Sequence, residues 1–321
     1  RKGHAMHALQ RRNFLRTACG ISLASCLRPA TRELLAQDAS DDELTIESVD
    51  VLRVSGPMTS NRGLNRQHQS QPLHLYEPPT EYHDDPDQTA TSYTARHDYV
   101  RIRTRSGLTG LYGYCDSDAA NYILGPLRRQ LIGHNAMAVE MLWDRMYRAD
   151  RMGRAGRYMK GISYLDCALW DLRGRHFGVP VYQLLGGPTR EFATAYGSCL
   201  GYSIEPERAA ARAVELKAAG FQNQKWFPAY GPVQGNDGLK LNIELVAALR
   251  SSLGEEVNLM FDPFQSWDLQ YALKWCRAVE QYNPTWLEEA FPTADLESFI
   301  RLSQSTSVPL ATGEHFFNRW E

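Results

Sequence analysis

The sequence predicts an α/β protein with parallel strands in its C-terminal part, and two observations point to this class. From about residue 192 onward, short apolar strands alternate five times with amphipathic helices, which is typical of parallel strands joined by crossover helices. The 321 residues are 43% hydrophobic and 22% charged, as expected for a globular protein. A doubly wound sheet and a TIM barrel both remain open, although no G-x-G-x-x-G follows the first strand.

Residues 1–40 are expected to be an export signal followed by an acidic linker. Arg11 and Arg12 precede a Phe-Leu pair and a short apolar segment, an order that resembles a twin-arginine signal. A periplasmic or otherwise exported protein is therefore predicted. A four-residue match to a lipoprotein cleavage box ends at Cys26 and gives lipid anchoring as a second option. If the segment is instead a basic stretch leading into an amphipathic helix, the protein is cytoplasmic.

Charge and cysteine spacing exclude several classes of function. The formal net charge of −2 argues against a nucleic-acid partner, and no apolar run is long enough to cross a bilayer. The cysteines after the signal lie far apart, with no C-x-x-C spacing, which argues against a zinc knuckle or a thioredoxin-like motif. We expect Cys115, Cys167, Cys199 and Cys276 to be buried free thiols.

The part from about residue 41 to 190 reads as a mixed α+β region. Residues 44–54 alternate like a strand, and the segment ending at 114 reads as two strands around a turn at Ser106-Gly107. The polar stretch 56–91 is long for a loop, so it is either a functional lid or disordered. Helical patterns follow at 118–130, 135–149 and 157–177, with Gly178 as the stop.

The last three of the five strand–helix repeats of the C-terminal part have an acidic residue at the end of the strand. The five strands are expected in FATAYGSCL, QNQKWF, VNLMFD, TWLEEAF and VPLATGEH, and the helices at 205–219, 239–252, 267–281 and 295–304. Asp262, Glu288 and Glu314 follow the last three strands at a constant spacing of 26 residues. One β/α unit of a TIM barrel takes about 30 residues, so each carboxylate falls at the end of a successive strand.

Three carboxylates at one end of a barrel would repel one another unless a cation lies between them. All-oxygen ligation favours Mg²⁺ over zinc, so these acids form a candidate magnesium site. The alternative is that each acid only caps the following helix. Glu288 and Glu289 are neighbours, and strand side chains alternate between faces. We therefore expect Glu288 to point inward as a ligand and Glu289 to take the other face or a supporting role.

Five segments together resemble the mandelate racemase and muconate-lactonizing branch of the enolase superfamily, over about 44–321. They are YLDCALWDLRGRHFGVPVYQLLGG, GFQNQKWF, FDPFQSW, WLEEAF and TGEH. The resemblance implies an α+β capping domain, here 41–190, followed by a TIM-type barrel, here 191–321. It also implies that Mg²⁺, held by Asp262, Glu288 and Glu314, binds the carboxylate of a small-molecule substrate. Assembly into a homo-oligomer is a further implication.

The family chemistry is removal of the proton beside a carboxylate, which Mg²⁺ and a lysine assist by stabilising the enediolate. Lys225 matches the first lysine of the family's K-x-K motif and is expected to act in catalysis and in substrate binding. Its alternative is a surface lysine. His315, in TGEH, is expected to contact the substrate or the departing hydroxyl. Its alternative is a supporting role behind the substrate-contacting residues.

The sequence departs from the family pattern at three places. Phe227 occupies the second lysine position of K-x-K, which argues against a two-base racemase. Phe264 stands where many members carry Asn, so a substrate contact differs. The chain stops at Glu321, after about five barrel strands, and three further β/α units would need about 90 residues. The His–Asp dyad of such members would lie there, so the sequence is expected to be a fragment or a truncated product.

The favoured function is Mg²⁺-dependent dehydration of a sugar acid to a 2-keto-3-deoxy acid. In this reaction, enolisation is followed by loss of the β-hydroxyl as water. A racemase, epimerase or cycloisomerase of the same family is one alternative. A carboxylate-binding protein without catalysis is the other. The identity of the sugar acid is not encoded in any of these motifs.

Overall fold

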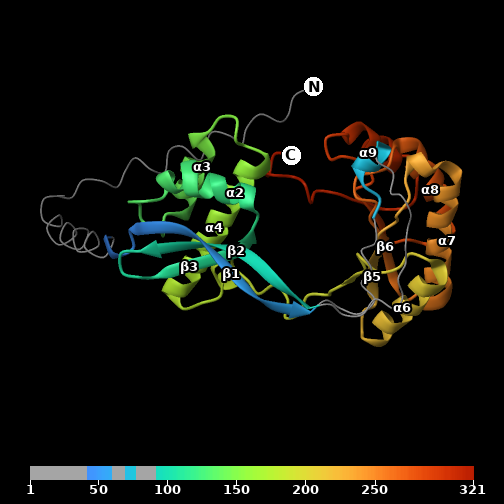
Figure 1. Ribbon diagram of the computed structural model, residues 1–321, viewed down its shortest axis with the longest axis horizontal. Coiled ribbons are helices and arrows are strands. Elements are labelled where there is room, and N and C mark those ends of the chain that lie inside the picture. The colour runs from blue at the N-terminus through green and yellow to red at the C-terminus, as the bar shows by residue number, and fades with distance from the viewer. Residues whose placement is uncertain (1–41, 60–68, 77–91) are drawn as a thin grey trace, which may run out of the picture.

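A computed structural model describes residues 42–59, 69–76 and 92–321. Within these residues there are two sheets: an antiparallel one of order β1-β2-β3 and a parallel one of order β4-β5-β6-β7-β8. The first sheet and helices α2 to α5 form the antiparallel lobe, and the second sheet and helices α6 to α9 form the parallel lobe, which lie side by side (Figure 1). The predicted export signal, including Cys26, lies outside the described residues. No described helix has both the length and the apolarity needed to span a membrane.

The antiparallel lobe is a three-stranded sheet covered by helices. Strands β1 (Ile46–Thr59), β2 (Ser92–Thr104) and β3 (Thr109–Cys115) pair in chain order. The turn predicted at Ser106-Gly107 is confirmed, with Gly107 at a φ of 84°. β1 runs further than expected, because it pairs with β2 as far as Thr59 opposite Ser92. Residues 56–59 of the predicted loop 56–91 therefore belong to β1, and of the rest of that stretch only 69–76 are described.

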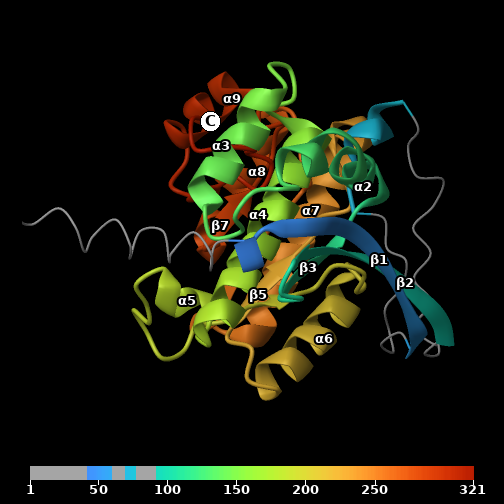
Figure 2. The same cartoon turned by 90° about the vertical axis from the view of Figure 1, so that its left-hand side faces the viewer.

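Helix α4 (Gly156–Phe177) is the main support of this sheet and confirms the predicted helix 157–177. Its apolar stripe is fully buried at Ile162, Leu165, Ala168, Leu169 and Leu172. It packs across β2 and β3 (Figure 2). Gly178 ends it in the left-handed conformation, at φ 68°, where a glycine has no steric penalty.

The other helices of this lobe are shorter than predicted. The predicted helix 118–130 is broken into α2 (Ser117–Tyr122), a π turn η2 (Ile123–Leu127) and a 3-10 turn η3 (Arg128–Gln130). The break contains Pro126, which has no backbone N–H and cannot continue the helical ladder. α3 (Val139–Ala149) begins four residues later than expected, and α5 (Val181–Leu184) closes the lobe.

The parallel lobe confirms the predicted alternation of strands and helices. Its strands are β4 (Gly197–Ser198), β5 (Asn223–Trp226), β6 (Asn258–Phe261), β7 (Trp286–Glu288) and β8 (Leu310–Ala311). Each pairs in parallel with the next in sequence. The crossover helices are α6 (Pro206–Ala218), α7 (Gly235–Leu253), α8 (Leu269–Val279) and α9 (Leu296–Ser303). Short 3-10 turns, η4 (Pro232–Gln234) and η5 (Glu280–Tyr282), flank α7 and α8.

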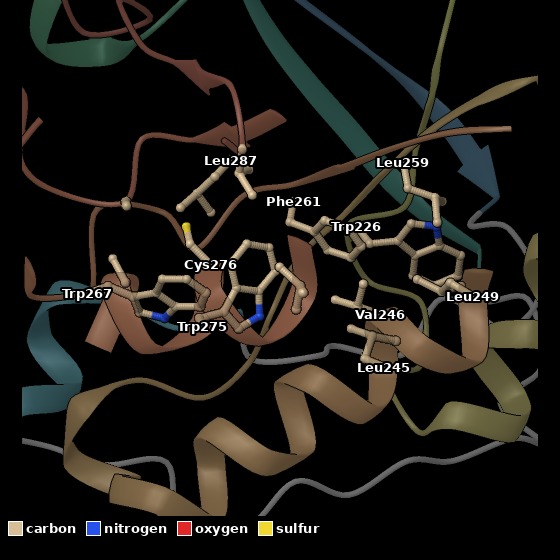
Figure 3. Packing of buried hydrophobic residues seen from close by; sticks show 14 of the residues in the cluster. Trp226, Leu245, Val246, Leu249, Leu259, Phe261, Trp267, Trp275, Cys276 and Leu287 are labelled. Carbon is tan, nitrogen blue, oxygen red and sulfur yellow. The ribbon is translucent and has the colours of Figure 1, made fainter. Parts of the chain in front are cut away.

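The core of this lobe lies between the strands and their helices. Figure 3 shows Trp226 and Phe261 from the strands meeting Leu249 from α7 and Trp275 from α8. Phe261 and Trp275 contact edge to face, with ring centroids 5.5 Å apart. Asp268 caps the N-terminus of α8 by accepting from the Tyr271 N–H, which satisfies a donor that the helix cannot. The strands are therefore buried against the helices, and their C-terminal ends lie at one edge of the sheet.

Two segments connect the lobes near these strand ends. Residues 69–76 include the turn η1 (Pro72–Leu75), and the Ser70 N–H donates to the Pro228 carbonyl, just beyond β5. The segment after β8 runs back to the antiparallel lobe (Figure 1), where Phe317 packs against the core that contains α3 and α4. Cys115, Cys199 and Cys276 are buried free thiols as predicted, whereas Cys167 is only half-buried.

Candidate active site

Lys225 joins two carboxylates from the next two strands. Its Nζ donates to Glu288 Oε1 at 2.6 Å and to Asp262 Oδ2 at 3.1 Å. Lys225 lies in β5, Asp262 directly follows β6, and Glu288 ends β7. Parallel pairing in register brings these strand ends to the same edge of the sheet. The structure thus gathers three of the predicted site residues, and the surface-lysine alternative for Lys225 is wrong, because only 6% of the residue is exposed.

The surroundings of Lys225 keep its positive charge. Burial by itself would lower the Lys225 pKa, but the hydrogen bond to Glu288 and the charges of Asp262 and Glu288 outweigh it and raise that pKa. The ammonium also lies 5.6 Å from the ring centroid of Tyr196 and 5.3 Å from that of Phe227, a distance at which an aromatic face attracts a cation. Phe227 therefore lies against the lysine whose partner in the K-x-K motif it replaces.

Asp262 is held by the turn that follows it. Its Oδ1 accepts from the Phe264 N–H at 3.0 Å, and its carbonyl accepts from the Gln69 amide nitrogen at 3.3 Å. Burial raises the pKa of Asp262, and the neighbouring Glu288 adds to this, against the lowering effects of Lys225 and the Phe264 N–H. Phe264 itself is 38% exposed, with a φ of 55°. Glu288 is fixed by the Trp286 indole, which donates to Oε2 at 2.9 Å.

Glu314 is not brought to this cluster. β8 ends at Ala311, and Gly313 then turns the chain at a φ of 115°, so Glu314 lies three residues beyond the strand and its side chain is exposed. Across residues 42–59, 69–76 and 92–321, no group of three His, Cys, Asp or Glu side chains is gathered closely enough to hold a metal. The constant spacing in sequence therefore placed two carboxylates together and did not fix the third.

Glu289 and His315 form a second pair beside the first. Glu289 is 2% exposed, and its Oε2 lies 2.5 Å from His315 Nδ1. Gln265 donates to the same Oε2 at 2.9 Å. The supporting role considered for Glu289 agrees with this burial. No sequence signal pointed to Gln265 or Gln69, because their partners lie on loops far away in the chain.

The donor set at the Lys225 cluster suits an oxygen-preferring cation. Two carboxylates from successive strands already converge on one positively charged atom, and both are largely buried. Two ionised carboxylates this close repel each other unless a cation or a proton lies between them. Asp262 and Glu288 therefore fit Mg²⁺, which binds through one or two carboxylates and keeps several waters. Glu314, three residues beyond β8, is exposed and lies outside this pair of acids.

Two protein families match the chain in sequence. Residues 73–186 match the N-terminal domain of mandelate racemase / muconate lactonizing enzyme, and residues 208–321 match the family described as enolase C-terminal domain-like. An L-rhamnonate dehydratase of Saccharopolyspora erythraea is 32% identical over 225 residues, 69% of this chain and 55% of the relative. A D-mannonate dehydratase of Sphingomonas sp. is 32% identical over 245 residues, 66% of this chain and 60% of the relative. The chain thus spans less than two thirds of these relatives.

Solved structures agree with the sequence relatives. The L-rhamnonate dehydratase from Gibberella zeae superimposes with a TM-score of 0.69 at 27% identity, covering 85% of this chain and 65% of that one. Rhamnonate dehydratase from the same organism, complexed with Mg, gives 0.70 at 25% identity, covering 87% and 68%. The matched domains, the parallel sheet and the strand-end acids agree with one another. The chain belongs to the mandelate racemase and muconate lactonizing family of the enolase superfamily.

Proposed function

We propose that the protein removes the proton beside the carboxylate of a sugar acid and expels the β-hydroxyl as water, forming a 2-keto-3-deoxy acid. The observation that carries this proposal is a pair of largely buried carboxylates at the ends of β6 and β7. Asp262 and Glu288 both accept a hydrogen bond from the Lys225 ammonium. Similarity to rhamnonate and mannonate dehydratases supports the substrate class. Residues 41–190 would act as the capping domain and residues 191–321 as part of the barrel.

Asp262 and Glu288 are two of the proposed ligands of Mg²⁺, and Glu314 is proposed as the third, although the turn at Gly313 leaves its side chain exposed outside their cluster in this structure. Bound Mg²⁺ would supply positive charge for the substrate carboxylate as it gains enediolate character. Lys225 keeps its ammonium form among these acids, so it can hold a substrate oxygen by a charge-assisted hydrogen bond. The aromatic rings of Tyr196 and Phe227 on the Lys225 ammonium lower the local polarity, which strengthens that bond. Lys225 therefore acts as an electrostatic and binding group.

His315 is the proposed partner of the departing hydroxyl. His315 directly follows Glu314 in the chain, and its side chain is 40% exposed. As an imidazolium, protonated on both ring nitrogens, His315 can deliver one proton to the leaving oxygen, so that water departs in place of the poorer leaving group hydroxide. Phe264, on the turn after Asp262, is the proposed apolar contact to the substrate.

The segment 69–76 is the proposed lid. Ser70 and Gln71 line a cavity of about 350 Å³ together with Gln265 and Trp267 from the turn after β6. Gln265 also bonds to Glu289, so one side of this cavity adjoins the strand-end cluster. We expect the lid to influence the choice of sugar acid more than metal affinity.

The direct test is a substrate panel with Mg²⁺ and with EDTA, read by mass spectrometry of the product. Loss of one water from L-rhamnonate or D-mannonate, with a keto acid formed only in Mg²⁺, supports dehydration. A product of unchanged mass identifies the alternative class of racemase, epimerase or cycloisomerase. A sugar acid that binds without any conversion favours the carboxylate-binding alternative, for which the exposed position of Glu314 is the specific observation.

Export and assembly are separate proposals. We infer that residues 1–40 direct twin-arginine export, because paired arginines precede an apolar segment. Replacing Arg11 and Arg12 by lysine should keep the protein inside the cell, and unchanged export would refute the signal. We infer a homo-oligomer from family membership. Light scattering that gives a monomer mass at all concentrations would refute it.

A further inference from the structure

Glu289 is a buried carboxylate that connects the loops after three neighbouring strands. It directly follows β7, and 2% of it is exposed. Its Oε1 accepts from the Gly313 N–H at 3.1 Å and lies 3.5 Å from Thr312 Oγ1, both after β8. Its Oε2 accepts from Gln265 Nε2 at 2.9 Å, after β6, and lies 2.5 Å from His315 Nδ1. Each carboxylate oxygen of Glu289 thus has two partners.

The backbone fixes the same residue. Glu289 has a φ of 36° and Gln265 a φ of 59°, a left-handed conformation that costs free energy for residues other than glycine. The two are held there by a backbone hydrogen bond of 2.7 Å from the Gln265 N–H to the Glu289 carbonyl. The backbone and the contacts from the loops after β6 and β8 therefore fix the orientation of the Glu289 carboxylate.

This geometry favours one position for the proton of neutral His315. Two groups approach Nδ1: the Glu289 oxygen at 2.5 Å and the Gln265 amide nitrogen at 2.7 Å. A carboxylate only accepts hydrogen bonds, so an unprotonated Nδ1 would set two lone pairs against each other at 2.5 Å. With the proton on Nδ1, the imidazole donates to Glu289, which is also where the Gln265 amide donates.

We propose that Glu289 is a positioning residue that holds neutral His315 in the Nδ1–H form, with Nε2 as the nitrogen left for a ligand. Nε2 has no hydrogen-bond partner within the described ranges, and the His315 side chain is 40% exposed. A carboxylate behind a histidine fixes tautomer and ring orientation in many proton-transfer sites. The catalytic consequence rests on the proposed dehydration: there Nε2 first takes up a proton, the Glu289 carboxylate stabilises the resulting imidazolium through Nδ1–H, and Nε2 then passes the proton to the departing hydroxyl.

The test is long-range ¹⁵N–¹H NMR of the full chain labelled with ¹⁵N-histidine, at a pH above the ordinary imidazole pKa of about 6.5. His315→Gln identifies the His315 signals by their loss. The wild type should show a protonated Nδ1 and an unprotonated Nε2. In Glu289→Gln, the amide N–H₂ can donate to Nδ1, so the proton should move to Nε2. The matched control Gln265→Met removes the competing contact and should leave the Nδ1–H form unchanged.

An unprotonated Nδ1 in the wild type would overturn the proposal, and that spectrum needs no variant to fold. The same tautomer in Glu289→Gln as in the wild type would overturn it too, as would a switch in Gln265→Met. Kinetics form a separate arm: Glu289→Gln should lower kcat about 10²-fold, with KM and Mg²⁺ affinity within twofold. If the chain converts no sugar acid, the proposed dehydration fails, while the NMR result still decides the role of Glu289.

Discussion

The Lys225 ammonium lies 2.6 Å from the Glu288 carboxylate, with 8% and 14% of the two side chains exposed. Asp262, with 6% of its side chain exposed, completes the cluster at 3.1 Å. One positive charge therefore faces two negative charges in a place with little water. Removal of the lysine leaves a pair of buried carboxylates without compensation, which is the costly state for ionised groups.

Lys225→Met should lower the free energy of unfolding by about 3–5 kcal/mol in EDTA, because a buried ion pair is broken from one side. Added Mg²⁺ should restore part of the loss, since a cation can replace the ammonium. Urea denaturation with and without Mg²⁺ measures both values. Lys240→Met is the control, because Lys240 is 75% exposed and pairs only on the surface. Its change should stay within about 0.5 kcal/mol. An equal loss for Lys225→Met in EDTA and in Mg²⁺ would contradict cation binding by these acids.

Gly110→Ala should destabilise the antiparallel lobe. A Cβ at Gly110 would meet the Ala168 carbonyl oxygen at 2.1 Å and Leu172 Cβ at 2.6 Å, so β3 and α4 would have to separate. Overpacking of this kind costs about 1–3 kcal/mol or more. Gly56→Ala is the matched control in β1, where a Cβ meets nothing within 4 Å. Thermal denaturation of both variants decides the point, and equal melting temperatures would refute close strand–helix contact at Gly110.

Asp166→Asn should stabilise the protein at neutral pH. Burial and the nearby Glu140 raise the pKa of Asp166 to about 6. Both carboxylates line a cavity of about 300 Å³ with Trp143 and Trp170. Because the folded-state pKa lies above the unfolded value, the folded state binds the proton more tightly. Stability is therefore lost as pH rises from about 4 to 6. After allowance for solvent screening at this partly exposed group, the penalty above pH 6 is about 1 kcal/mol.

The measurement is the difference in unfolding free energy between Asp166→Asn and the wild type, at pH 7.5 and at pH 3.5. We expect Asp166→Asn to gain about 1 kcal/mol of stability at the higher pH and none at the lower one, where the wild-type carboxyl is uncharged too. Glu140→Gln removes only the repulsion and should give a smaller gain with the same pH dependence. A pH-independent difference for Asp166→Asn would argue against a titrating Asp166.

Gln69→Leu should raise KM for the sugar acid while leaving Mg²⁺ affinity within twofold. Gln69 is 5% exposed and donates to the Asp262 carbonyl, so the change removes one buried contact between the lid segment and the strand ends. Loss of about 1 kcal/mol corresponds to roughly fivefold in KM. Leu73→Ala, at an exposed position of the same segment, is the control. If Mg²⁺ affinity falls as much as KM rises, the segment supports the metal site and is not a selective lid.

The alternation of strands and helices could be predicted because it is a local signal. Strands β6 and β7 lie in short apolar runs, and the helices that follow them carry an apolar stripe at helical spacing, so neither signal depends on distant contacts. Asp262 and Glu288 follow from the same reasoning, because parallel strands in register bring residues after successive strands together. Residues 55–59 of β1 were not predicted as strand, since their pairing with β2 as far as Thr59 depends on a strand 33 residues away.

The rest of the site depends on loop conformation, which sequence spacing does not encode. Glu314 has the expected spacing, yet the turn at Gly313 leads it away from the cluster. Glu289 is buried because the turns after β6 and β8 both donate to it. Each of those turns contains a residue with positive φ. The neighbouring glutamates Glu288 and Glu289 indicated that only one of them faces the Lys225 cluster. They did not indicate that the other, Glu289, binds His315.

The central claim is that the strand-end carboxylates support removal of the proton beside a substrate carboxylate. The most direct measurement is the fate of deuterium placed on that carbon of a sugar acid, followed by NMR with Mg²⁺, with EDTA, and with Asp262→Asn. We predict that deuterium passes to solvent only with Mg²⁺ and the wild-type chain, as the keto acid forms. Retention of the deuterium in a chain that binds both Mg²⁺ and the sugar acid, or its release in EDTA, would contradict the account.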